Sequence, residues 1–192
     1  MATTEQAATK MLEATIRGIL RLIGENPDRD GLKETPARVA KMFYSELFAG
    51  YKQDPTDVFK TFEVETSKNM IVLRGISFYS QCEHHMLPFF GEVDIAYIPG
   101  DRVLGLSKFA RLIDIFAHRL QVQERMTEQI TDAIWENLVP EGCGVIVSAE
   151  HLCMSLRGVR RPHVRTITSA VRGSFRDDPS TRAEFLSLVK GV

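Results

Sequence analysis

The stretch EVDIAYI, residues 92–98, alternates apolar and other side chains along its length. Successive side chains of a β-strand point to opposite faces of a sheet, so Val93, Ile95 and Tyr97 would share one face. Comparable patterns occur in four further segments, which places a β-sheet at the centre of the predicted fold. These segments are residues 60–66, 69–78, 144–157 and 164–175.

Two helical patterns precede the strands. Apolar residues recur at helical spacing over residues 4–24 and again over 35–47. Thr35 is expected to be the N-cap of the second helix, because proline follows it at the first helical position. We therefore expect an N-terminal helical extension, residues 1–58, ahead of a main domain, residues 59–192.

Further helices are expected between and after the strands. Ser107 would cap one helix, a second would begin at about Glu124, and a short last helix would run from Pro179 to Gly191. Helices, then strands, then helices and strands again indicate an α+β fold with a mostly antiparallel sheet.

The composition narrows the class of protein. The 192 residues carry 24 Lys and Arg against 25 Asp and Glu, a net charge of −1 that argues against a protein that coats nucleic acid or anionic membrane. No apolar run approaches the roughly 18 residues of a membrane span, and the Met1–Lys10 start is polar, unlike a signal peptide. With only three cysteines, we expect a protein of a reducing compartment, the cytoplasm.

Five of the eight cysteines and histidines fall in two short clusters. In the first, Cys82 and His85 have the spacing that lets two ligands from one tight turn reach one metal ion. Taken alone, this cluster fits equally well a buried cysteine with two surface histidines, His84 and His85. The second cluster, His151 and Cys153, favours the metal site.

On the expected strand over residues 144–157, every second side chain from His151 would share one face with Cys153 and Arg157. Three protein ligands suit a catalytic zinc ion, which keeps its fourth position open for a water of lowered pKa. We predict that Cys82, His85 and Cys153 are these ligands. His84 and His151 would then be free to donate and accept protons. A four-ligand site that includes His151 remains the alternative.

Basic residues occupy unusual helix positions. Lys108, Arg111 and Arg38 lie in or near first turns, where cations oppose the helix dipole. Together with Arg157 they favour a polyanion such as a phosphate chain, although each one alone fits a solvated surface. Glu124, preceded by Gln123, opens its helix either as a dipole partner or as an acceptor for a guanine edge, and the sequence does not choose between these.

Several motifs, in order along the chain, resemble those of GTP cyclohydrolase I. The central ones are CEHH (82–85), GLSK (105–108), QVQER (121–125), and HLC (151–153) with Arg157-Gly158. The resemblance extends through ETPAR (34–38), TITS (166–169) and TRAEFL (181–186), so it covers nearly the whole chain.

The resemblance implies a tunnelling fold, a four-stranded antiparallel sheet backed by two helices, with an N-terminal helical extension. It also implies a homodecamer of two stacked pentameric rings with active sites between subunits. The implied reaction converts GTP and water to 7,8-dihydroneopterin triphosphate and formate. Under this reading water on one zinc ion per subunit attacks C8 of the guanine.

The same resemblance implies roles for single residues. Cys82, His85 and Cys153 would hold the zinc ion, and His151 would protonate the opening ring. The remaining roles are divided among the later steps and the binding of substrate. His84 and Ser107 would assist ribose rearrangement, Glu124 and Gln123 would hold the guanine, and Lys108, Arg111, Arg157 and Arg38 would hold the triphosphate.

Two departures from the family pattern, residues 162–165 and Arg172, concern local packing and none of these roles. One alternative is a relative of the same fold that binds a purine or pterin but catalyses another reaction, which should have lost a zinc ligand or His151. The other is a non-catalytic oligomer stabilised by zinc, which needs no free histidine and no basic helix starts.

Overall fold

The computed structural model of the chain describes residues 4–63 and 69–190. Contacts between Cα atoms divide it into two compact units, Met1–Ala49 and Gly50–Val192. The expected domain boundary between residues 58 and 59 stays a prediction. No helix in the described ranges combines the length and the apolar character needed to cross a membrane.

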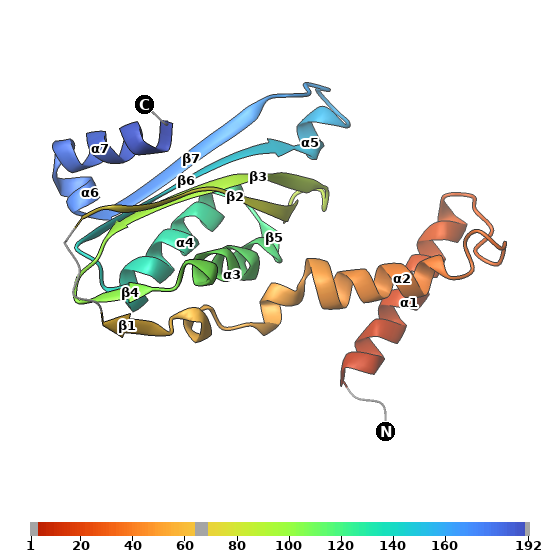
Figure 1. Cartoon of the computed structure of the whole chain (residues 1–192). Helices are drawn as coiled ribbons and strands as arrows, with labels where there is room; N and C mark the ends of the chain where they lie inside the picture. The colour runs from red at the N-terminus through yellow and green to blue at the C-terminus, as the bar shows by residue number, and fades with distance from the viewer. Residues whose placement is uncertain (1–3, 64–68, 191–192) are drawn as a thin grey trace. The chain divides into compact units, whose positions relative to one another are not determined.

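The first unit is helical (Figure 1). α1 (Thr4–Leu22) packs against α2 (Thr35–Met42), which continues into the π-helical turn η1 (Phe43–Leu47). The N-cap of α2 is Glu34, so the expectation of Thr35 was one residue late. Proline is tolerated throughout the first turn because the N–H groups there have no partner within the helix.

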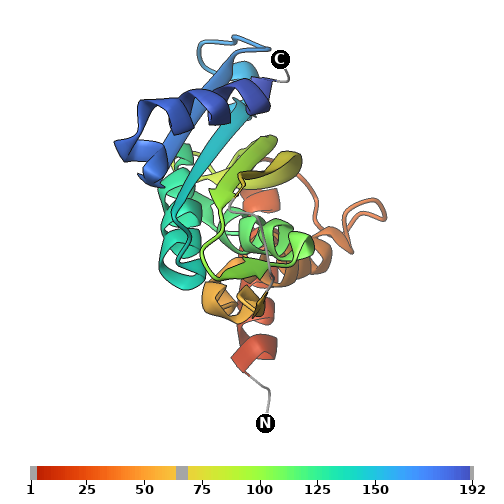
Figure 2. The same cartoon turned by 60° about the vertical axis from the view of Figure 1, so that its left-hand side comes forward.

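The second unit is built on an antiparallel sheet of four long strands in the order β2-β3-β6-β7. The two-residue strand β5 adds to the end of β2 in the parallel direction. Helices α3 and α4 cover one face of the sheet, as Figures 1 and 2 show. This arrangement confirms the predicted α+β class with four antiparallel strands backed by two helices. The bounds of these elements are β2 Ile71–Cys82, β3 Pro88–Ile98, α3 Leu106–Ala117, β5 Leu120–Gln121, α4 Gln123–Leu138, β6 Gly142–His151 and β7 Arg165–Gly173.

Smaller elements complete the unit. Of the strand expected over residues 60–66, residues 61–63 form β1 (Thr61–Glu63), which pairs with β4 (Arg102–Leu104), and residues 64–66 lie outside the described residues. The 3-10 turns are η2 (Ala49–Lys52) and η3 (Pro55–Val58), and the remaining helices are α5 (Leu152–Ser155), α6 (Ser174–Asp177) and α7 (Pro179–Lys190).

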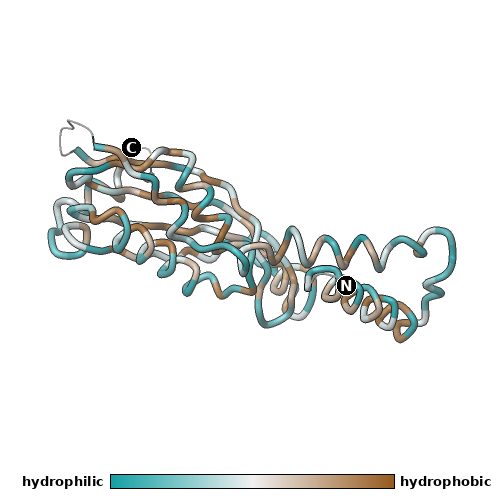
Figure 3. The backbone as a smooth tube through the Cα atoms, turned by 90° about the horizontal axis from the view of Figure 1, so that it is seen from below, coloured by the Kyte–Doolittle hydropathy of each residue, from teal (hydrophilic) through white to brown (hydrophobic). Residues whose placement is uncertain are grey.

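The main core lies between the sheet and helices α3 and α4, where Figure 3 shows apolar segments of the chain. Val93, Ile95 and Tyr97 are buried there, as the alternation predicts, while Glu92 is exposed. Ala96 on the opposite face is also fully buried, because α6 and α7 cover that part of the sheet. The sheet therefore has two covered faces at this end.

The strand expected to run to residue 157 was wrong beyond His151. His151 pairs with Phe89, next to the first residue of β3, Pro88. Proline has no N–H to donate and β3 begins there, so β6 loses its partner strand. The chain turns into the short helix α5 instead.

Two other expectations require comment. Ser107 is not an N-cap, because α3 begins at Leu106 after Gly105 and leaves Ser107 inside the first turn. Arg172, the departure in packing, links β7 to α4 through ion pairs with Glu128 and Asp132. A charged side chain is thus accommodated at the surface of this helix rather than in the core.

Candidate metal centre and active site

The first cluster forms a tight turn at the end of β2. The N–H of Cys82 donates to the carbonyl of Leu87, and the carbonyl of Cys82 accepts from the N–H of His85 (3.4 Å) and of Met86 (2.8 Å). Met86 adopts a φ of 54°, in the left-handed region that is uncommon for a residue other than glycine. These bonds fold the chain back so that Cys82 and His85 lie on the same side of the turn.

Cys153 reaches this turn from α5 rather than from a strand face. The ligand atoms of Cys82, His85 and Cys153 all lie within 4.8 Å of one another. A tetrahedral zinc ion with S and N ligands at its usual distances needs separations of roughly 3.5–3.8 Å, so a small contraction would close the site. Among the described residues, this is the one group of His, Cys, Asp or Glu side chains that could hold a metal ion.

Two side chains border this group of three ligands. The Sγ of Cys82 lies 3.8 Å from Nδ1 of His84, which is exposed. Nη1 of Arg157 lies 2.9 Å from Nε2 of His85, and a guanidinium can only donate, so Nε2 accepts. Burial, followed by the Cys82 sulfur, raises the pKa of the Cys153 thiol, while Arg157 lowers it.

His151 lies beside the ligand group at the end of β6. Its ring stacks on Phe89 with centroids 4.7 Å apart and planes 1° apart. Its Nε2 is 2.8 Å from Oε1 of Gln123, the first residue of α4. Burial lowers the pKa of His151, and the carboxylate of Glu124 opposes this shift in part.

Glu124 lines a cavity of about 360 Å³ between the start of α4 and β7. Thr127, Thr168 and Glu128 also line it, and Glu128 is paired with Arg172. Glu124 has no ion pair among the residues that the structure describes. An unpaired carboxylate in a small cavity near His151 can accept hydrogen bonds from a bound ligand.

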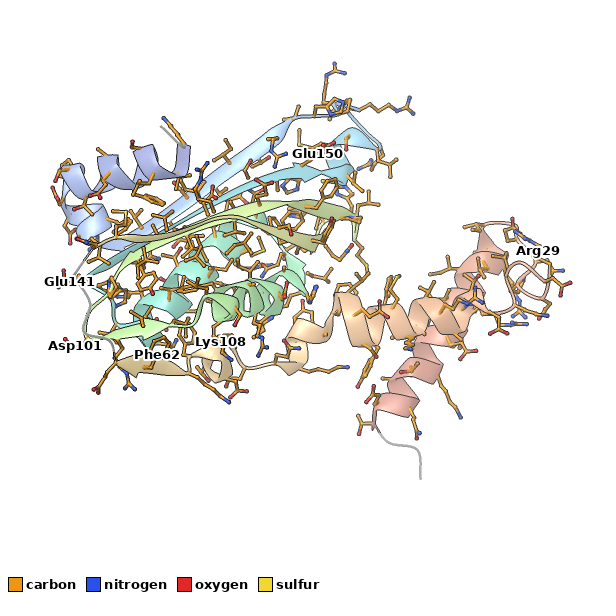
Figure 4. All side chains as sticks on the ribbon, viewed as in Figure 1. Arg29, Phe62, Asp101, Lys108, Glu141 and Glu150 are labelled. Carbon is orange, nitrogen blue, oxygen red and sulfur yellow. The ribbon has the colours of Figure 1, made fainter. Side chains whose placement is uncertain are left out.

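Other predicted site residues lie apart from the metal group. The Ser80 hydroxyl donates to the carbonyl of Ala117 at 2.7 Å, so the end of β2 lies at the last turn of α3. Ser107 and Lys108 are at the first turn, about 15 Å away along a helix of this length. Figure 4 likewise shows Lys108 beside the helices below the sheet, away from Glu150 on the sheet itself.

The remaining basic residues also lie on different elements of the structure. Arg111 lines a separate cavity of about 530 Å³ on α3, together with Lys52 and Asp114. Arg38 belongs to the first compact unit. Of the three basic residues in the second unit, Lys108, Arg111 and Arg157, the one bonded to a member of the ligand group is Arg157.

Sequence reasoning missed two features of the site. No role was assigned to Phe89, and no local pattern marks it as the partner of a histidine 62 positions later. Gln123 is expected to hold the guanine edge with Glu124, which stays a prediction, and the feature missed is that its side chain is 1% exposed and bonded to His151 and to β6 and β7. Its position in the motif QVQER was the available signal, although that motif does not reveal which way the side chain points.

An antiparallel sheet backed by two helices, with two thiols, an imidazole and a half-buried histidine at one end, defines an α+β protein with three side chains that could hold a metal ion. The family model of GTP cyclohydrolase I matches residues 12–190. The chain belongs to the GTP cyclohydrolase I family, and the tunnelling fold implied by the sequence motifs is confirmed.

Individual relatives match over most of their length. GTP cyclohydrolase 1 of Thermobifida fusca (strain YX) is 53% identical over 94% of this chain and 87% of its own. GTP cyclohydrolase 1 of Dehalococcoides mccartyi (strain CBDB1) is 51% identical over 93% of this chain and 95% of its own. A solved archaeosine synthase QueF-Like structure in the apo form, 19% identical, covers 56% of this chain and 97% of its own with a TM-score of 0.45, a likeness too low to bear on function. Family membership makes the chain an enzyme of the GTP cyclohydrolase I type.

Proposed function

We propose that this chain opens the imidazole ring of GTP with water, releases formate and forms 7,8-dihydroneopterin triphosphate, the first step of pterin and folate biosynthesis. The observation that carries the proposal is the convergence of Cys82, His85 and Cys153 beside His151 in a member of this family. Neither of the two alternative functions accounts both for the three ligands and for the histidine beside them. A relative with another reaction should lack one of these four side chains, and a purely structural zinc site needs no histidine beside it.

The proposed cofactor is one zinc ion per chain. Two thiols and one imidazole are ligands that zinc prefers, and their separations lie close to those of a tetrahedral site. When bound, zinc would activate water for attack near neutral pH. His151 is proposed to exchange a proton with the purine ring as it opens, and burial favours its uncharged form by lowering its pKa. His84 and Ser107 are proposed to serve the later ribose rearrangement.

Glu124 is proposed to accept hydrogen bonds from N1–H and the 2-amino group of guanine. Because the side chain of Gln123 is engaged elsewhere, its contribution to this edge would come from its backbone N–H. The first N–H groups of a helix have no partner within the helix, and Val122 at the N-cap provides no side-chain cap. The cavity beside Glu124 would thus offer both an acceptor and donors to the base.

The Glu124→Gln variant is expected to lose about 10- to 100-fold in kcat/KM for GTP, the range for hydrogen bonds to a charged group. The preference for GTP over inosine triphosphate, which lacks the 2-amino group, should fall with it. Steady-state kinetics on both nucleotides measure this, with Glu136→Gln, an exposed residue on the same helix, as the control. An unchanged preference in Glu124→Gln would remove Glu124 from the guanine site.

The triphosphate is proposed to bind Lys108, Arg111, Arg157 and Arg38. Within the second unit, Arg157 lies at the ligand group, whereas Lys108 lies in the first turn of α3, away from the end that meets β2. For these cations to act on one nucleotide, different chains have to contribute them. This separation supports active sites between subunits, and we propose a homodecamer with no nucleic-acid or membrane partner. The free cysteines of the ligand group support a location in the reducing cytoplasm.

Incubation of the purified chain with GTP tests the whole proposal. Equimolar formate and the ultraviolet spectrum of a dihydropterin are expected, and the activity should sediment with an assembly of ten chains. Hydrolysis of GTP to GDP without formate would point to a different reaction. Absence of any turnover in verified zinc-loaded protein would favour the non-catalytic zinc-stabilised oligomer.

A further inference from the structure

The side chain of Gln123 is held from several directions within the fold. It is 1% exposed, and its Nε2 lies 3.1 Å from the carbonyl of Val147, 3.0 Å from that of Thr166 and 3.1 Å from Oγ1 of Thr168. Its Oε1 lies 2.8 Å from Nε2 of His151. One amide therefore joins the start of α4 to β6, to β7 and to the histidine.

The chemistry of these partners determines the orientation of the amide. The carbonyl oxygens of Val147 and Thr166 can only accept hydrogen bonds, so the NH₂ group of Gln123 must face them. Its Oε1 must then face His151, and Oε1 can only accept. His151 consequently donates from Nε2, and the neutral ring carries its proton on that atom.

Two threonine hydroxyls extend this arrangement. Thr127 Oγ1 donates to the backbone carbonyl of Gln123 at 2.8 Å and lies 2.7 Å from Thr168 Oγ1. Since the Thr127 proton is used, Thr168 donates to Thr127 and accepts from Nε2 of Gln123. The donor and the acceptor are therefore fixed in each hydrogen bond of this buried network, and all of these bonds favour the same orientation of the Gln123 amide.

The ring of His151 is restricted on its flat side as well. It stacks on Phe89 with planes 1° apart, which fixes the plane of the ring, and a flip of the ring within that plane would break the bond between its Nε2 and Gln123. The remaining ring nitrogen, Nδ1, is the one that can exchange protons with a ligand.

We propose that Gln123 is a positioning residue that holds His151 in the Nε2–H tautomer and leaves Nδ1 as the proton-exchanging atom. The role of that atom in catalysis rests on the proposed function, whereas the tautomer does not. In this proposal the side chain of Gln123 orients His151 through a hydrogen bond and does not bind the guanine base.

Solid-state ¹⁵N spectra of the zinc-loaded full-length protein, labelled separately at Nδ1 and Nε2 of histidine, test the tautomer at pH 8. The His151 signals are assigned by their loss in His151→Ala. We expect a protonated Nε2 and an unprotonated Nδ1 for His151 in the unmodified protein. A protonated Nδ1 with a bare Nε2 would overturn the proposal whether or not GTP is turned over.

The Gln123→Met variant tests the positioning role, because methionine keeps the volume and removes the acceptor. We expect mixed His151 tautomers and a kcat lowered about tenfold or more, with zinc content and KM for GTP within about twofold, since the bond that orients His151 is lost together with the amide's bonds to β6 and β7. Thr131→Val is the control for folding, because Thr131 is fully buried on the same helix and its hydroxyl donates to the Thr127 carbonyl. Unchanged tautomer and kcat in folded Gln123→Met would refute the role. If that variant does not fold, the ¹⁵N spectra of the unmodified protein decide alone, and an unprotonated Nε2 on His151 would refute the role.

Discussion

Replacement of Cys153 by alanine is expected to remove most of the bound zinc and to lower GTP ring opening by at least about a hundredfold. The loss of a residue that hydrogen-bonds to a metal ligand already costs about 10- to 100-fold in metal affinity or activity, and Cys153→Ala removes a ligand itself. Only Cys82 and His85 would remain, and two ligands from one turn hold zinc weakly. Zinc measured by mass spectrometry and formate released from GTP report the two effects separately.

Cys143→Ala provides the matched control. Cys143 is fully buried, its Sγ lies 3.9 Å from the carbonyl of Thr131, and burial raises its pKa to about 12. A thiol in this environment remains protonated and does not serve as a ligand. The variant should therefore keep its zinc and its turnover. Full zinc content and activity in Cys153→Ala would show that the metal, if present, binds elsewhere.

His151→Ala is expected to keep its zinc but to lose about 10²- to 10⁴-fold in kcat, the usual contribution of a positioned acid or base. Phe89 and Gln123 contact the ring but no metal ligand depends on it, so the ligand group should survive the change. KM for GTP should change little, because the guanine contacts are assigned to Glu124. Single-turnover formate release isolates the ring-opening step.

The zinc content of the same variant decides the question left open by the sequence. Loss of zinc from His151→Ala would make His151 a fourth ligand, and unchanged turnover would remove it from proton transfer. His163→Asn, at an exposed position with a φ of 64° that asparagine tolerates, is the control. It should match the unmodified protein in both zinc content and turnover.

The pattern of side chains was sufficient for most of the fold. Alternation over residues 92–98 identified β3 and its buried face, and helical spacing identified the helices that cover it. The errors lie at element ends. The strand from residue 144 was extended through Cys153 because the alternation continues in the sequence, whereas pairing stops where β3 begins at Pro88. Ala96 lies on the face opposite Val93 and Ile95, and it is buried there because Phe175 and Phe185 of α6 and α7 pack against it.

The sequence by itself determined which kinds of side chain the site contains. Cysteine and histidine in two clusters specify ligand chemistry, and spacing within the turn brings Cys82 and His85 together through local backbone bonds. Only the tertiary structure decided how these groups are used. Cys153 approaches from a helix, Arg157 lies against His85, and Gln123 faces His151 rather than the cavity. These contacts join residues 28 to 72 positions apart, so they depend on strand register and on how α4 packs on β6 and β7. Local periodicity encodes the face of an element, but the partner opposite that face is set by long-range packing.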